Sequence, residues 1–159
     1  TKLDDEFLAE KYSNSGLEVI GLRYFNIFGK GQTGSYAGVI TQFMRKLNEQ
    51  KPPIIYGDGT QIRDFIHVSD IAEANLSAML SKTNSGFFNV GTGVGTKIKD
   101  LAKIMIKIFN EKFEPNYHDS LKGDVKISQA DISKSQDLLN WKYSIGIEEG
   151  LEKMIKLKK

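Results

Sequence analysis

The sequence predicts an α/β fold, in which short apolar strands alternate with amphipathic helices along the chain. Three observations favour this class. A near-continuous apolar run over residues 17–28 is typical of a parallel strand covered on both faces. Apolar residues recur at helical spacing over 38–50. Strand-like and helix-like stretches then follow one another to the end of the chain.

The first elements are a helix, a strand and a second helix. Residues 1–15 space their apolar side chains as a helix does, and Gly16 is a suitable C-cap. The strand over 17–28 runs into a glycine-rich loop. The helix over 38–50 ends before the two prolines at 52 and 53, which disfavour helical backbone in the residues that precede them.

A short strand over 54–56 is predicted next. Asp70, with Glu73 three residues later, resembles a capping box, and we expect it to open a helix over 71–80. The apolar run over 86–90 predicts another strand.

The last third of the chain is predicted to be mainly helical. Thr96 is the expected cap of a helix over 97–110, and 114–117 is expected to be extended. Two more helices are expected, over 132–140 and from about 147 to 157.

Composition limits the possible functions. The 159 residues fit one domain, and 40% apolar with 26% charged content is ordinary for a globular protein. A net charge of +2 gives no argument for nucleic acid or an anionic membrane, and no apolar run spans a bilayer. With no cysteine and only two histidines, we expect no metal site. The chain opens without methionine, as if inside a helix, so we expect a piece of a longer protein without a signal peptide.

Residues 54–70, IIYGDGTQIRDFIHVSD, are the most informative stretch. Arg63 stands in an extended, aromatic-rich run that follows a tight glycine turn. A guanidinium held in such a run is suited to gripping a phosphate from one direction. The alternative is a surface ion pair between Arg63 and its neighbour Asp64, which residue types alone favour.

Four other features bear on function, and two of them, Asn26 and Tyr56, have two interpretations each. Asn26 ends the first predicted strand and either donates to a ligand oxygen or stabilises the following turn. Tyr56 either stacks on a nucleobase or packs within its strand. The loop 91–96 has threonine where a dinucleotide fingerprint needs its last glycine, so we expect a structural turn. Trp141 is expected to be a core residue.

Four segments resemble, in order, the extended short-chain dehydrogenase/reductase family in its nucleotide-sugar epimerase and dehydratase branch. They are RYFNIFG at 23–29, YGDGTQIRDFIHVSD at 56–70, FNVGTG at 88–93 and GDVKISQADISKSQDLLNW at 123–141. Within this branch the chain looks most like UDP-glucose 4-epimerase-like proteins.

The resemblance implies the C-terminal half of such an enzyme: the last strands and helices of a Rossmann-like sheet plus a small α/β substrate-binding domain. Residues 1–30 would end the dinucleotide-binding domain. Residues 31–159 would mainly bind the nucleotide sugar, with 64–95 returning to the Rossmann sheet. The family's Tyr-x-x-x-Lys pair would place its lysine at Lys2 and its tyrosine four residues upstream. The glycine-rich fingerprint would also lie upstream.

The resemblance also implies roles for individual residues. Lys2 would be the catalytic lysine, which hydrogen-bonds the nicotinamide ribose and lowers the pKa of the upstream tyrosine. Phe25 would contact the nicotinamide of NAD through its backbone, and the missing half would hold most of this cofactor. Asn26 and Arg63 would hold the diphosphate, and Asp124 would order the loop that closes over the nucleotide. The full set of implied substrate-binding residues is Asn26, Ala37, Gly38, Val39, Ile55, Tyr56, Arg63, Lys122, Asp124 and Ser128.

The implied function is an NAD-dependent UDP-sugar 4-epimerase that works through a transient 4-keto sugar and needs its upstream half for turnover. The alternatives are a nucleotide-sugar 4,6-dehydratase, a UDP-glucuronate decarboxylase, or a non-catalytic scaffold protein on the same fold. A cytoplasmic homodimer is expected, with no nucleic-acid or membrane partner. Two positions depart from the family pattern. Leu121 replaces a second phosphate-binding arginine, although Lys122 beside it could supply charge, and the small Ser128 could admit a 2-acetamido group.

Overall fold

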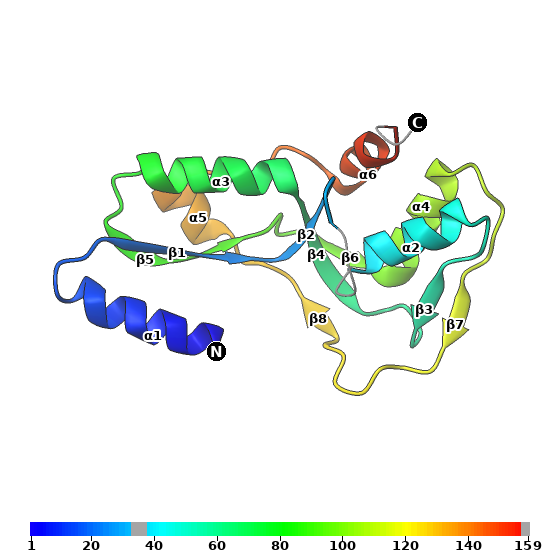
Figure 1. The fold of residues 1–159 in the computed structure, drawn as a ribbon, viewed down its shortest axis with the longest axis horizontal. Helices are drawn as coiled ribbons and strands as arrows, with labels where there is room; N and C mark the ends of the chain where they lie inside the picture. Colours follow the sequence, from blue (N-terminus) through cyan, green and yellow to red (C-terminus); the bar gives the residue numbers. More distant parts are fainter. Residues whose placement is uncertain (33–37, 157–159) are drawn as a thin grey trace.

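The computed structural model describes residues 1–32 and 38–156, and its strands and helices alternate as an α/β fold (Figure 1). The helices are α1 (Lys2–Ser13), α2 (Val39–Asn48), α3 (Val68–Leu80), α4 (Ile98–Ile108), α5 (Ser133–Leu139) and α6 (Ile147–Lys156). The strands are β1 (Val19–Tyr24), β2 (Asn26–Phe28), β3 (Ile54–Tyr56), β4 (Ile62–His67), β5 (Ser85–Val90), β6 (Gly95–Lys97), β7 (Asn116–His118) and β8 (Ile127–Ser128).

The strands form three groups. β1 pairs with β5 in parallel, and β3 pairs with β7 in parallel. β4 stands at the centre of the third group, with β2 and β8 parallel to it and β6 antiparallel. Figure 1 shows β4 between the β1–β5 arm and the β3–β7 pair.

The single strand expected over 17–28 is wrong in one respect, because the chain changes sheets within it. The N–H of Phe25 still donates to the carbonyl of Val90 at the end of β5, at 3.0 Å. Asn26, the next residue, is already in register with Phe65 of β4. One residue therefore separates two sheets, and an apolar run cannot reveal such a switch because both strands are equally apolar.

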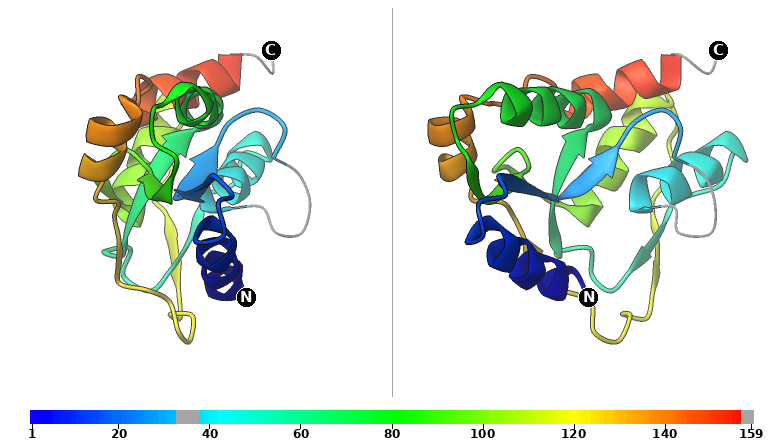
Figure 2. Two further views of the ribbon diagram at one scale, coloured as in Figure 1. Left: turned by 90° about the vertical axis from the view of Figure 1, so that its left-hand side faces the viewer. Right: turned by 60° about the vertical axis from the view of Figure 1, so that its left-hand side comes forward.

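Helices cover the β1–β5 pair on two sides. α3 and α5 lie on one face of it and α1 lies on the other (Figure 2). α2, α4 and α6 gather at the other end of the molecule, beside β3, β4 and β6. No helix in the described ranges is long and apolar enough to cross a membrane.

Two apolar cores lie on either side of β4. Phe65 belongs to a core with Phe28, Ile55 and side chains of α2, α4 and α6. Ile66, its neighbour, belongs to a second core with α3, β5 and Trp141. Successive strand residues face opposite ways, so β4 supplies both cores at once. Trp141 is 3% exposed, which confirms it as a core residue.

Two expected helix caps are wrong. α3 begins at Val68, and His67 is its N-cap, where Nδ1 accepts from the Ser69 N–H at 3.3 Å. Asp70 lies inside the helix, and its carboxylate accepts from the N–H and hydroxyl of Ser144 at 2.9 and 2.7 Å. α4 begins at Ile98 after Lys97, and the expected cap Thr96 lies in β6. The sequence pattern misleads here because a carboxylate that caps a helix and a carboxylate that binds a distant segment are the same residue type.

Candidate functional site

Arg63 lies on β4, where its side chain is 16% exposed and bound on several sides. Nη1 donates to the carbonyl of Val125 at 2.6 Å and to the carbonyl of Ile62 at 2.8 Å. Nη2 forms an ion pair with Asp124. The partner of Arg63 is therefore not Asp64, and the surface Arg63–Asp64 pair that residue types favoured is wrong. Arg63 is instead a largely buried cation that two loop residues hold in one orientation.

Asp64 faces the opposite way and is fully buried. Its Oδ1 accepts from the N–H and hydroxyl of Thr92 at 2.8 and 2.6 Å, and its Oδ2 accepts from the N–H groups of Gly93 and Ala130 at 2.9 and 3.2 Å. A side chain at Gly91 would place Cβ 2.8 Å from Oδ2. Residues 91–93 thus wrap around a carboxylate, whereas Gly95 and Thr96, the last residues of the turn expected over 91–96, lie in strand β6.

Asn26 at the start of β2 joins that strand to β4. Its Nδ2 donates to the main-chain carbonyl of Asp64 at 2.9 Å. The amide thus bonds a neighbouring strand and not the following turn at Gly29. It stands one residue after Phe25, whose own N–H is used by Val90. A backbone contact from Phe25 to a nicotinamide would therefore have to come from its carbonyl oxygen.

Tyr56 and His118 form an exposed aromatic pair on the β3–β7 ribbon. Tyr56 is 38% exposed, and the two rings meet edge to face with centroids 5.9 Å apart. The Tyr56 ring is therefore supported by His118 and partly accessible, which suits contact with a flat ligand. Ile55 is only 1% exposed and belongs to the core, so only its main chain can border a ligand.

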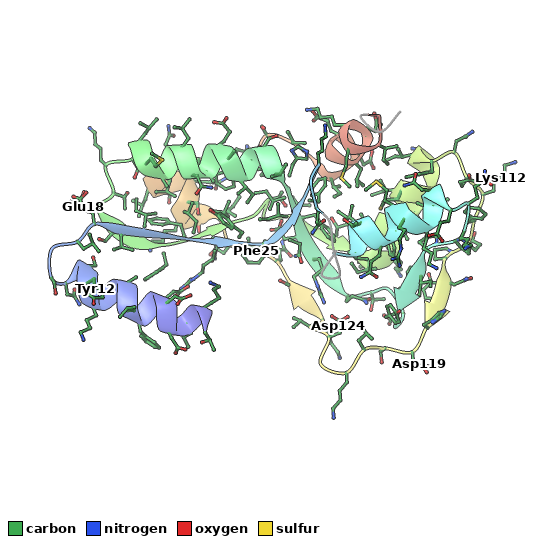
Figure 3. All side chains as sticks on the ribbon, viewed as in Figure 1. Tyr12, Glu18, Phe25, Lys112, Asp119 and Asp124 are labelled. Atoms are coloured by element: carbon green, nitrogen blue, oxygen red, sulfur yellow. The ribbon has the colours of Figure 1, made fainter. Side chains whose placement is uncertain are left out.

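The loop after β7 runs past Asp119 and Asp124 toward β8 (Figure 3), and its residues Asp124 and Val125 contact Arg63. Gln61 connects this loop to β3, because its Nε2 donates both to Asp124 Oδ2 at 3.3 Å and to the Tyr56 carbonyl at 2.8 Å. Ser128 of β8 is in register with Arg63 and half-buried. Lys122 and Leu121 are exposed on the same loop. Hence Arg63, Tyr56, Asp124 and Ser128 come together through Gln61 and β8.

The remaining implied substrate residues lie at the start of α2. Gly38 is the N-cap of this helix, with extended backbone at φ −62° and ψ 170°, and Val39 is the first helical residue. Ala37 lies outside the described residues. Among the described residues neither Gly38 nor Val39 hydrogen-bonds Arg63, so their place in the site stays a prediction.

Lys2 lies far along the chain from this cluster, in the first turn of α1. Its side chain is fully exposed, and Nζ forms an ion pair with Asp5 at 3.2 Å. It lines a cleft of about 680 Å3 between α1 and the β1–β5 pair, together with Glu6, Arg23, Tyr24 and Phe87. The ammonium is therefore accessible to a cofactor or to a side chain placed at the end of β1.

Two side chains that hold this cluster together are not among the predicted site residues. Asp64, expected at most as a surface partner of Arg63, binds the loop after β5, and Gln61 joins the Tyr56 carbonyl to Asp124. A signal for Asp64 exists in the sequence. Two successive charged residues in a strand point to opposite faces, so one of Arg63 and Asp64 had to point inward.

The chain is similar to proteins of a known family. A model of the NAD dependent epimerase/dehydratase family matches residues 1–91. The UDP-glucuronate 4-epimerase of Thermodesulfobacterium geofontis is 36% identical over 98% of this chain and 48% of that protein. The UDP-N-acetyl-alpha-D-glucosaminuronate decarboxylase of Bacillus cytotoxicus is 32% identical, with 95% and 49% covered.

The fold is also similar to that of solved structures. The crystal structure of the UDP-glucose 4-epimerase of Thermotoga maritima with UDP-glucose is 36% identical and superimposes with a TM-score of 0.87. That match covers 97% of this chain and 49% of the solved one. The chain thus spans about half the length of the relatives it matches. Because the family match covers more than half of its 159 residues, this chain belongs to the NAD-dependent epimerase/dehydratase family.

Proposed function

We propose that this chain is the nucleotide-sugar-binding half of an NAD-dependent UDP-sugar 4-epimerase. The observation that carries the proposal is the held guanidinium of Arg63, a cation 16% exposed that pairs with Asp124 and stands in register with Ser128. A diphosphate needs fixed donors, and a uracil needs a flat apolar contact such as the Tyr56 ring. The similarity to a UDP-glucuronate 4-epimerase and to a UDP-glucose 4-epimerase solved with UDP-glucose supports this proposal.

The chemistry would divide between binding and proton transfer. NAD, when bound, accepts hydride from C4 of the sugar and returns it to the other face. Lys2 would favour the phenolate of an upstream tyrosine, because a nearby cation lowers a phenol's pKa, and the phenolate would take the C4 hydroxyl proton. Arg63 and Asn26 would hold the diphosphate while the hexose turns over, so that binding energy far from C4 positions the reacting sugar. In this structure Asn26 reaches only the Asp64 carbonyl, so its ligand contact must use the remaining amide atoms.

Arg63→Ala tests the phosphate role in the complete enzyme, which is this chain preceded by the upstream half that its relatives carry. Removal of one partner of a desolvated charge pair costs about 2–5 kcal/mol, so UDP should bind at least thirtyfold more weakly by isothermal titration calorimetry. Arg45→Ala removes the same charge from the exposed end of α2 and should leave UDP affinity unchanged. An Arg63→Ala enzyme with wild-type affinity for UDP would refute the phosphate role.

Two other reactions share this half of the fold, a 4,6-dehydration and a decarboxylation. NMR of the products separates the three: an epimer, a 4-keto-6-deoxy sugar, or a pentose with released carbon dioxide. We propose further that Ser128 admits 2-acetamido sugars. Turnover of UDP-glucose without turnover of UDP-N-acetylglucosamine by the complete enzyme would contradict that role. A scaffold protein would carry phenylalanine or leucine at the upstream tyrosine position.

We also propose that the complete enzyme is a homodimer. α1 buries no side chain here, and its large apolar residues are more than half exposed. These residues are Leu3, Phe7, Leu8 and Tyr12. Sedimentation velocity should give a dimer for the wild-type enzyme and a monomer for Phe7→Glu. A monomeric wild-type enzyme would contradict the proposal.

A further inference from the structure

Helix α1 is attached to the rest of the chain by very few contacts. It buries none of its side chains, and an isolated helix of 12 residues is marginal in water. At its C-terminal end the hydroxyl of Ser13 donates to the hydroxyl of Ser85 at 2.6 Å. In its first half the described contact with the sheet is a bond between Glu6 and Arg23 of β1. Among the described residues, this pair is the side-chain hydrogen bond that ties the first turns of α1 to the sheet.

The pair has the geometry of a strong ionic bond. Nε of Arg23 donates to Oε1 of Glu6 at 2.7 Å, and Nη2 donates to Oε2 at 2.5 Å. Both oxygens are engaged in a two-pronged contact, which fixes direction as well as distance. The Glu6 side chain is 23% exposed and that of Arg23 is 50% exposed. The hydrogen bond lowers the pKa of Glu6 and raises that of Arg23, so both groups are charged at neutral pH.

A ring of the neighbouring strand β5 supports the Arg23 side chain. Its guanidinium lies 5.6 Å from the centre of the Phe87 ring on β5. That ring occupies the space over Gly21, where a Cβ would come within 2.4 Å of Phe87 Cδ1. The absence of a side chain at Gly21 leaves room for the Phe87 ring, and the guanidinium of Arg23 packs over that ring in a cation–π contact. Arg23 therefore has a defined position on the strand.

Lys2 lies on the same face of α1, one turn before Glu6. Both residues and Arg23 line the cleft of about 680 Å3. The ion pair of Lys2 is with Asp5 of its own helix, and its side chain is fully exposed. The ammonium is therefore placed by the position of the helix and not by a bond of its own to the sheet.

We propose that Glu6 and Arg23 are a positioning pair that fixes the first turns of α1, and with them the Lys2 ammonium, against the C-terminal end of β1. The docking of α1 stands on the contacts of this chain alone. The consequence for Lys2 rests on the proposed function, because it assumes that Lys2 serves a cofactor and an upstream tyrosine.

Hydrogen exchange of the 159-residue chain tests the docking without any assumption about activity. The slow amides in the first half of α1 should exchange up to about fivefold faster in Glu6→Gln, the upper range for a partly exposed pair. Glu10→Gln makes the same chemical change on an exposed position of the same helix and should exchange as the wild type. Equal rates in Glu6→Gln and Glu10→Gln would overturn the proposal.

Kinetics of the complete enzyme test the consequence for Lys2. Glu6→Gln should lower kcat about tenfold with an unchanged KM for the UDP-sugar, since a small misplacement of a catalytic group has large effects on rate. The apparent pKa of the base in the kcat profile should also rise, because a displaced Lys2 favours the phenolate less. Arg23→Lys keeps the charge but not the two-pronged contact, so its kcat should lie between those of the wild type and Glu6→Gln.

The two experiments separate the possible failures. Faster exchange in α1 with kcat and pH profile equal to those of Glu10→Gln would overturn the positioning role and leave a purely structural pair. A wild-type complete enzyme without epimerase activity would refute the proposed function and the Lys2 consequence. The exchange rates would still decide whether the pair docks α1.

Discussion

Asp64→Asn should remove much of the stability of this fold. In the structure each carboxylate oxygen accepts two donors: Oδ1 from the Thr92 N–H and hydroxyl, Oδ2 from Gly93 and Ala130. Asparagine has the same shape but offers one oxygen and one NH2 group. Whichever way the amide turns, two buried donors lose their acceptor and face another donor. At about 1.5–3 kcal/mol for each bond to a charged acceptor, the loss is about 3–6 kcal/mol.

Urea unfolding followed by circular dichroism measures this loss, which is large against the about 5–15 kcal/mol of a typical domain. Asp137→Asn makes the same change on the exposed surface of α5 and should stay within about 0.5 kcal/mol of the wild type. Thr92→Val removes the hydroxyl, which donates to Asp64 and accepts from the Val94 N–H at 3.1 Å, and leaves the other three donors of Asp64 in place. It should cost about 1–2 kcal/mol, which provides a graded variant if Asp64→Asn does not fold. An Asp64→Asn loss below about 1 kcal/mol would refute the reasoning that the buried donors need the carboxylate.

Protonation of His67 should destabilise the fold, because burial lowers its pKa below the ordinary 6.5. The unfolded chain then binds the proton more tightly, so stability is complete above about pH 6.5 and falls as pH drops through the folded pKa. Urea midpoints from about pH 5 to 8 measure this slope, which His67→Gln should flatten and the exposed His118→Gln should not. Gly91→Ala should cost about 1–3 kcal/mol, since its Cβ would press on Asp64, whereas Gly146→Ala meets no atom within 4 Å and should be near neutral. Finally, the 159-residue chain alone should not epimerise UDP-sugars, and an epimer detected by NMR would contradict this.

Local patterns predicted much of the fold. The helix over 38–50 and the strand over 54–56 appear as α2 and β3, because their apolar spacing and flanking prolines are local signals. The absence of one glycine predicts a structural turn over 91–96, and the structure has a turn in its first residues and strand β6 from Gly95 onward. β6 and β8 were not predicted, since strands of three and two residues exist only through their pairing with β4.

The sequence predicts the residues of the candidate site better than it predicts their partners. Arg63 was found because a guanidinium in an extended run is unusual. Its partner Asp124 lies 61 residues away, so residue types pointed to the adjacent carboxylate instead. Asp70 was read as a helix cap, and its real contact is with Ser144. Short-range chemistry can be read from a sequence, but a choice between a near and a distant partner depends on the fold.

The strand pairings of this chain also have a consequence for how fast it folds. β1 pairs with β5, β3 with β7 and β4 with β8, and each of these pairs joins segments more than 60 residues apart. Long loops must therefore close before any of these contacts forms, which is typical of slow folding. The four donors of Asp64 come from beyond residue 90, so they should assemble after the rate-limiting step. Asp64→Asn should then speed unfolding and leave the refolding rate almost unchanged.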